Sequence, residues 1–108
     1  MRRTYALLQV ALVLMSDPTA QHWGYELSKQ SGVRSGVMYP ILSRMLDEGW
    51  LTDGWEPHAE IDGAKRPPRR YYELTAAGTA ALGGLIANAR SDVRFKSLLA
   101  LQPVQVTP

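Results

Sequence analysis

The sequence predicts a mainly α-helical fold with a small β-hairpin, and three features lead to this prediction. Apolar residues recur at helical spacing along most of the chain. A stretch rich in aromatic residues follows Gly49, and a similar stretch returns after a proline-rich loop. The 108 residues, 45% of them hydrophobic, suffice for one compact domain and hardly for two.

The composition excludes several classes of site. The chain has no cysteine, which rules out disulfides and thiolate zinc sites and is typical of a protein of the reducing cytoplasm. His22 and His58 lie far apart in the sequence, so we expect no metal and no cofactor. The net charge is only +2, and the distribution of the basic residues is therefore more informative than their sum.

The first helix is expected over Arg3 to Met15. Gln9 is its only polar residue after Thr4, so the helix is apolar nearly all round. Such a helix must be covered on more than one side, and we expect a second subunit to cover part of it. The apolar run is far shorter than the about 20 residues that cross a bilayer, so we expect no membrane segment.

Two helices joined by a short turn follow. The first is expected to run from about Ala20 or Trp23 to Ser31, with Gly32 as its stop. The second begins at Ser35, which we predict to be its N-cap, and closes at Gly49, which can take the left-handed conformation. Two helices around a tight glycine-containing turn form a helix-turn-helix, whose second helix enters the major groove of DNA.

The two sides of this second helix differ. At about 100° per residue, the side that faces the core carries Met38, Ile41, Leu42 and Met45. The opposite side, with its flanks, carries Gly36, Tyr39, Pro40, Ser43, Arg44 and Asp47. A small outer face with few acids suits a helix that enters a DNA groove. A plain amphipathic helix is the alternative, and the helix alone does not decide between the two.

Pro40 is unusual inside this helix. It removes one backbone hydrogen bond and crowds the carbonyl of Gly36, at a cost of about 3 kcal/mol. We expect the helix to begin one or two residues late, which would lower this cost. A proline that is tolerated there can mark a surface that approaches a partner closely.

The chain then takes a composition typical of strands. One strand is expected over Trp50 to Glu56, bulged at Gly54, and a returning strand over Arg69 to Leu74. The residues between them contain prolines and mixed charges and are expected to form a loop. The order of helix, helix, helix, strand, loop, strand and helix is that of a winged helix.

The loop and the returning strand carry the clearest basic cluster of the chain, which consists of Lys65, Arg66, Arg69 and Arg70. Arginine side chains suit phosphate oxygens or a narrow minor groove. A solubilising loop is the alternative, and it is less favoured because a helix-turn-helix precedes the cluster. The loop also holds a weak candidate cation site, for which a solvated loop is the stronger interpretation: Glu56, His58, Glu60 and Asp62.

A last helix is expected to begin at Ala76 with Thr75 as its N-cap. We expect its apolar stripe and the first helix to form a homodimer across a two-fold axis, with packing inside one chain as the alternative. The residues expected at the dimer contact are Leu8, Leu12, Leu82, Leu85, Ile86, Ala89 and Val93. The predicted organisation is a winged helix-turn-helix domain over 1–74, a C-terminal dimerisation helix over 75–102 and a disordered tail over 103–108.

Four motifs together resemble the PadR family of transcriptional regulators. They are Gly24 to Leu27, Met38 to Met45 around Tyr39-Pro40, Glu48 to Leu51, and Arg69 to Gly78. They occur in order and at suitable spacing, and the resemblance extends over most of the chain. It implies a winged-helix repressor that acts as a homodimer, with the third helix in the major groove, the wing on the flanking backbone or minor groove, and the C-terminal helix at the dimer contact.

The resemblance also implies a small planar aromatic effector as a candidate partner. Trp23, Trp50 and Trp55 are candidates to line its site, although tryptophans near the base of a wing more often belong to the core. No sequence motif identifies the effector.

The predicted function is that of a DNA-binding transcriptional regulator, a repressor that binds a palindromic operator as a homodimer. The alternative is a winged-helix protein-interaction module without DNA binding. The sequence has no catalytic Ser/His/acid constellation and no phosphate-binding glycine loop, so we do not expect an enzyme. The residues expected to contact double-stranded DNA are Lys29, Arg34, Ser35, Tyr39, Pro40, Ser43, Arg44, Lys65, Arg66, Arg69 and Arg70.

Overall fold

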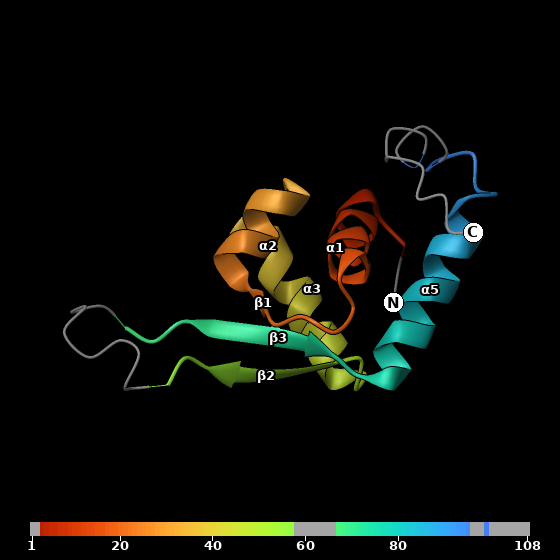
Figure 1. Ribbon diagram of the computed structural model, residues 1–108. Helices are drawn as coiled ribbons and strands as arrows, with labels where there is room; N and C mark the ends of the chain where they lie inside the picture. The colour runs from red at the N-terminus through yellow and green to blue at the C-terminus, as the bar shows by residue number, and fades with distance from the viewer. Residues whose placement is uncertain (1–2, 58–66, 96–98, 100–108) are drawn as a thin grey trace.

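Figure 1 shows the computed structural model, in which residues 3–57, 67–95 and 99 are described. The helices are α1 (Tyr5–Ser16), α2 (Gly24–Ser31), α3 (Ser35–Asp47) and α5 (Ala76–Ala89). The strands are β1 (His22–Trp23), β2 (Leu51–Trp55) and β3 (Arg70–Leu74). The predicted mainly helical fold with a β-hairpin is confirmed. Over the described ranges, no helix combines the length and the apolar character needed to cross a membrane.

The three strands form one antiparallel sheet in the order β1–β3–β2. The register of β2 against β3 runs without interruption, and Gly54 lies opposite Tyr71. The bulge predicted at Gly54 is therefore wrong. The glycine is used instead for close approach, because the Tyr71 ring occupies the space that a Cβ at Gly54 would need. The sequence does not indicate β1, because so short a strand exists only through its pairing with β3.

Helix α1 is the centre of the helical layer. It packs against α2, α3 and α5 and lies between α2 and α5 in Figure 1. Thr4 caps it, since its hydroxyl oxygen accepts a hydrogen bond from the Leu7 N–H at 3.1 Å. The helix buries Leu7, Leu8, Val10, Ala11 and Leu14. A single chain thus covers more than one side of α1, and a second subunit is not required for this.

Thr75 joins α3, the sheet and α5. Its hydroxyl donates to the Gly49 carbonyl at 2.7 Å and accepts from the Gly78 N–H at 2.9 Å, so it caps α5 as predicted. Its own N–H donates to the Trp50 carbonyl at 3.0 Å. Gly78 approaches that same carbonyl so closely that a Cβ would overlap it. These contacts fix the direction in which α5 leaves the sheet.

Helix α5 ends at Ala89, whereas the apolar stripe predicted for it extends to Val93. The Ser91 hydroxyl donates to the Asn88 carbonyl at 3.0 Å, and the Asp92 carboxylate accepts from the Arg94 N–H at 2.9 Å. Polar side chains that bond to nearby backbone compete with the helix and favour a turn. The helix therefore gives way to a turn after Ala89.

This turn brings Phe95 back onto α1. The Phe95 side chain is buried, and its ring meets the Tyr5 ring edge-on with 5.1 Å between the centroids. Val93 lies in the turn and is 87% exposed, so it is not part of a helical stripe. The tail predicted over 103–108 lies outside the described residues.

Candidate nucleic-acid interface

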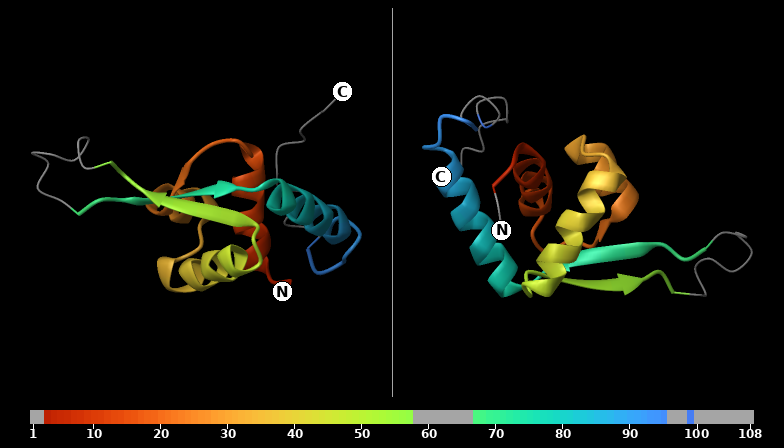
Figure 2. Two further views of the ribbon diagram at one scale, coloured as in Figure 1. Left: turned by 90° about the horizontal axis from the view of Figure 1, so that it is seen from below. Right: turned by 180° about the vertical axis from the view of Figure 1, so that it is seen from behind.

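Helix α3 has the two different sides that the sequence predicts. Its inner side buries Met38, Leu42 and Met45 in the core. In the right-hand view of Figure 2, α3 lies at the front of the molecule, and β2 and β3 extend away beside it. The exposed residues of its outer side and flanks are Ser35, Gly36, Tyr39, Pro40, Ser43, Arg44 and Asp47. The only carboxylate in this exposed set is at the end of the helix.

The start of α3 differs from the prediction. Ser35 is the first helical residue, and Arg34 is the N-cap, without a side-chain cap bond. The turn before it is held from α2 instead. The Ser28 hydroxyl donates to the Val33 carbonyl at 2.7 Å, and the Ser31 hydroxyl oxygen accepts from the Val33 N–H at 3.1 Å. The N-cap prediction for Ser35 is therefore wrong, because two serines of the preceding helix already stabilise the turn.

Pro40 lies inside α3, more than one turn from its start. The predicted late start of the helix is therefore wrong, and the missing hydrogen bond to the Gly36 carbonyl is not avoided. Gly36 is exposed, with open space where its side chain would be. Water can therefore reach the carbonyl that Pro40 leaves without its helical partner.

Both predicted glycine stops are confirmed. Gly32 ends α2 with φ +74°, and its N–H donates to the Ser28 carbonyl at 3.0 Å. Gly49 follows α3 with φ +76°. This left-handed region favours glycine because it has no Cβ. The two glycines set how α2, α3 and β2 turn relative to one another.

Tyr39 is oriented by contact with α2. A Cβ at Gly24 would overlap the Tyr39 hydroxyl, so the ring lies directly against the start of α2. Gly24 is buried, whereas Tyr39 keeps 44% of its surface exposed. Two of the sequence motifs, one around Gly24 and one around Tyr39, thus meet at one contact.

Arg70 has a different environment from the one predicted. Its Nε donates to the Asp53 carboxylate at 2.7 Å, and its Nη2 forms an ion pair with the same carboxylate. This hydrogen bond is the main cause of a raised pKa of Arg70. Arg70 is therefore already paired within the sheet, and its predicted contact with DNA stays a prediction. The sequence does not reveal this pair, because it depends on the register of two strands.

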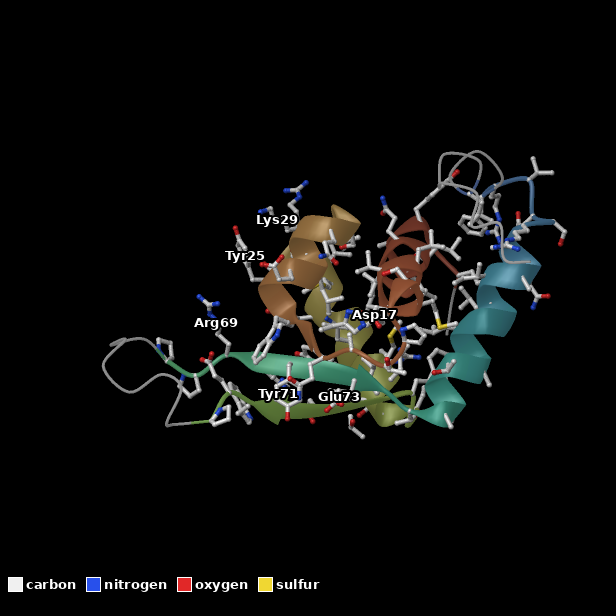
Figure 3. The ribbon with its side chains drawn as sticks, in the orientation of Figure 1. Asp17, Tyr25, Lys29, Arg69, Tyr71 and Glu73 are labelled. Carbon is white, nitrogen blue, oxygen red and sulfur yellow. The ribbon has the colours of Figure 1, made fainter. Side chains whose placement is uncertain are left out.

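Four other predicted DNA-contacting cations are exposed, and the described part of the chain gives them no carboxylate partner: Lys29, Arg34, Arg44 and Arg69. Figure 3 shows Lys29 projecting from α2 and Arg69 from the position just before β3, on the same side of the molecule. Tyr25, which the sequence analysis does not include among the DNA contacts, projects from α2 on this side as well and is 69% exposed. Its exposure is visible only in the structure. Lys65 and Arg66 lie outside the described residues.

Comparison with known proteins places the chain in a family. The profile of the transcriptional regulator PadR-like family matches residues 12–84. No curated protein matches the sequence. The chain belongs to the PadR-like family. Its members regulate transcription, so this PadR-like chain is a DNA-binding regulator and not an enzyme, and the alternative of an interaction module without DNA binding is not supported.

Solved structures of PadR regulators have the same fold. One from hypervirulent Clostridium difficile R20291 has a TM-score of 0.65 at 22% identity and covers 89% of this chain and 99% of its own. One from Eggerthella lenta DSM 2243 has a TM-score of 0.60 at 25% identity, with 87% and 82% covered. A PadR-like regulator from Bacillus cereus ATCC 14579 has a TM-score of 0.60 at 20% identity, with 90% and 92% covered.

Most residues predicted at the dimer contact of this PadR-like chain lie in its own core. Leu8, Leu82 and Ala89 have no exposed surface in the single chain, and Ile86 is 8% exposed. These side chains already pack inside one subunit and offer no surface to another, which corrects their assignment. The remaining residues of the predicted contact are partly buried or exposed: Leu12, Leu85 and Val93.

The three tryptophans do not line one effector site. Trp23 lies opposite Tyr71 in the sheet and meets its ring edge-on at 5.2 Å, whereas Trp55 lies opposite Arg70. Successive residues of a strand point to opposite faces, so Trp23 and Trp55 lie on opposite faces of the sheet. Trp50 packs against the core.

A shallow hollow of about 280 Å³ lies beside β1, between the end of α1 and α2. Asp17, Glu26 and Gln30 contribute to its polar lining. The buried His22 donates from Nε2 to the Asp17 carbonyl at 2.9 Å, so this imidazole has a structural partner. Ala20, Trp23 and Leu27 also line the hollow, and the predicted aromatic effector stays a prediction. Within residues 3–57, 67–95 and 99, no cluster of three metal-ligating side chains occurs.

Proposed function

We propose that this PadR-like regulator represses transcription by binding, as a homodimer, to a palindromic operator. One observation carries the proposal: the outer face of α3 is exposed, and Pro40 and Ser43 at its centre are uncharged. Exposed basic residues on either side of this face have no carboxylate partner in the described part of the chain. A duplex could therefore meet the helix without displacing any part of the molecule described here.

The proposed contacts divide into two classes. Tyr39, Pro40 and Ser43 would meet base edges and sugars in the major groove, whereas Arg34, Arg44 and Lys29 would neutralise phosphates. Arg44 is the one side chain of the α3 face able to form a bidentate pair with guanine. Specificity for the DNA sequence would therefore depend on apolar contact with thymine methyl groups and on the shape of the DNA. Ser35 and the wing residues Lys65, Arg66 and Arg69 complete the proposed set.

The homodimer is supported by the exposed side of α5, which carries the small residues Ala77, Ala80, Gly84 and Ala87. Small side chains allow a second helix to approach closely. A dimer with two-fold symmetry would present two copies of α3 to two half-sites, which explains why the operator should be palindromic. A dimer bound within a promoter would exclude the polymerase. Such a regulator would act in the cytoplasm.

Selection from a genomic DNA pool tests this proposal. The full chain is expected to retain fragments that share one inverted repeat, and to shift such a fragment on a gel as a complex with two copies of the 12.0 kDa chain. Retention of fragments without an inverted repeat, or a complex with one copy, would contradict the palindromic and dimeric parts of the proposal. Transcription from the selected promoter should rise when the gene for the regulator is deleted.

A further inference from the structure

Trp55 at the end of β2 is 60% exposed. Tryptophan is usually among the more buried residues, because so large an apolar surface gains much from leaving water. Where tryptophan is exposed, it is enriched at the centres of interfaces. An exposed tryptophan that is also held in one orientation therefore indicates a contact surface.

Trp55 is held by Arg70 on the neighbouring strand. The Arg70 guanidinium carbon lies 5.8 Å from the centroid of the Trp55 ring and 5.3 Å from that of the Tyr72 ring. Tyr72 is 1% exposed, so its ring is fixed in the core. The Asp53 carboxylate binds the same guanidinium through Nε and Nη2. The cation is thus fixed from two directions and supports one face of the exposed indole.

Trp55 lies between α3 and the wing, the loop that joins β2 and β3. Trp55 lies opposite Arg70, and Asp53 opposite Tyr72, so all four side chains belong to the sheet face that carries the buried Tyr72. Helix α3 packs against β2, the strand that ends at Trp55. If α3 enters a major groove and the wing reaches the adjacent minor groove, the sugar-phosphate strand between the two grooves must pass here.

We propose that Trp55 contacts duplex DNA at this sugar-phosphate strand, and that Arg70, fixed by Asp53, is the positioning residue that orients its ring. This inference rests on the proposed DNA-binding face of α3 and extends it to the base of the wing. The charge of Arg70 is already balanced by Asp53, so the pair contributes orientation and little net attraction to phosphate. Trp55 contributes apolar contact with deoxyribose, which does not depend on base sequence.

The test uses the full-length chain and one duplex selected from the genomic pool. Tryptophan emission should be quenched when the duplex binds, and Trp55→Phe should lose most of this change. Trp55→Ala should weaken binding about tenfold, which is typical of one important interface side chain. Thr52→Ala is the matched control, because Thr52 lies exposed on the opposite face of the same strand. It should bind the duplex with wild-type affinity.

The role of Arg70 is tested with Arg70→Lys and Arg70→Met. Lysine keeps the charge and methionine removes it, but both lose the planar guanidinium between the rings. Both variants should weaken binding and reduce the quenching, while the dependence of affinity on salt stays at the wild-type slope. A phosphate contact would instead lower the slope by about 0.9 for Arg70→Met and leave it unchanged for Arg70→Lys. That pattern would overturn the positioning role.

The result for the wild-type chain separates this inference from the function on which it rests. If the wild-type chain retains no duplex, the proposed function fails and the inference fails with it. If the wild-type chain binds while Trp55→Ala binds equally well and the emission is unchanged, the contact at Trp55 is overturned and the DNA-binding face of α3 is not.

Discussion

At the scale of single residues, glycines set how closely the elements of this regulator approach one another. Gly24 allows the Tyr39 ring to lie against the start of α2, and Gly78 allows the start of α5 to lie against the Trp50 carbonyl. Both positions are buried. The first contact supports the proposed DNA face, and the second determines where α5 leaves the sheet.

Substitution of Gly78 tests the second contact. Gly78→Ala should lower the free energy of unfolding by about 1–3 kcal/mol, because its Cβ would overlap backbone that cannot turn aside. Gly83→Ala is the matched control on the same helix. A Cβ at that position would make only ordinary contact with the Met15 side chain, at 3.8 Å, so it should raise stability by about 0.4–1 kcal/mol. Urea unfolding measures the free energy of unfolding of both variants. Equal effects of the two substitutions would contradict the close contact between Gly78 and the Trp50 carbonyl.

Arg69 is the described wing residue with a free charge. Arg69→Ala should weaken binding to all duplexes alike and lower the slope of log affinity against log salt by about 0.9, the value for one phosphate contact. Arg90→Ala makes the same change of charge at the far end of α5 and should leave the slope unchanged. Titrations over a range of salt concentrations distinguish the two, and an unaltered slope for Arg69→Ala would exclude the phosphate contact.

At the scale of elements, α3 keeps a proline that costs it a hydrogen bond. Pro40→Ala should restore the bond to the Gly36 carbonyl and raise the free energy of unfolding, by up to about 3 kcal/mol. The same variant should bind the selected duplex more weakly, because the outer face loses the ring that we propose meets the groove. Thermal unfolding and gel shift measure the two effects. Higher stability with undiminished affinity would show that Pro40 has no role in binding.

The turn after α5 carries the clearest pH dependence. Hydrogen bonds from the side chain and backbone N–H of Arg94 lower the pKa of Asp92 from 3.8 to about 2. A lowered carboxylate pKa stabilises the folded state above the unfolded pKa, and this contribution is lost as the pH falls from about 4 towards 2. Because the Arg94 side chain is 63% exposed, solvent screens the pair and the effect should be small.

Asp92→Asn removes the titrating group of this turn. The difference in unfolding midpoint between the wild type and this variant should therefore be constant above pH 5 and shrink as the pH falls below 4. Circular dichroism at a series of pH values measures it. A difference that grows on acidification would contradict the assignment.

Elements whose ends depend on neighbouring residues could be predicted from the sequence. Gly32, Gly49 and Thr75 act within a few positions of the helix that each one ends or begins, and all three have the predicted role. The prediction failed at Ser35 because the turn before α3 is held by serines of another helix, and Arg34 takes the N-cap position. The strand β1 and the packing of Phe95 on Tyr5 depend on residues far away in the sequence, for which no local pattern exists.

In the candidate site too, features that depend on neighbouring residues could be predicted, and features that depend on distant residues could not. The exposed face of α3 could be predicted from helical periodicity, because burial of one side leaves the other side free. The pairing of Arg70 with Asp53 could not, since it depends on which residues β2 and β3 bring together. The position of Leu8 and Leu82 inside one chain depends on how α1 and α5 pack, which composition does not determine.

At the scale of the whole molecule, the surface proposed to contact DNA and the surface proposed to form the dimer lie at opposite ends. Strands β2 and β3 extend away at one end and α5 lies at the other, with α1 between them (Figure 1). If the exposed side of α5 meets a second copy, α3 and the base of the wing stay uncovered in both copies. Two-fold symmetry would then present α3 and the base of the wing of both copies to one duplex.

Hydroxyl-radical footprinting of the selected duplex with the full chain tests this arrangement most directly. We expect two protected segments related by two-fold symmetry and separated by one turn of DNA, about 10 base pairs, or by a multiple of it. Each segment should include the sugars between the major groove occupied by α3 and the minor groove beside the wing. Protection of a single segment, or of one groove alone, would contradict the claim that α3 and the wing bind one duplex together.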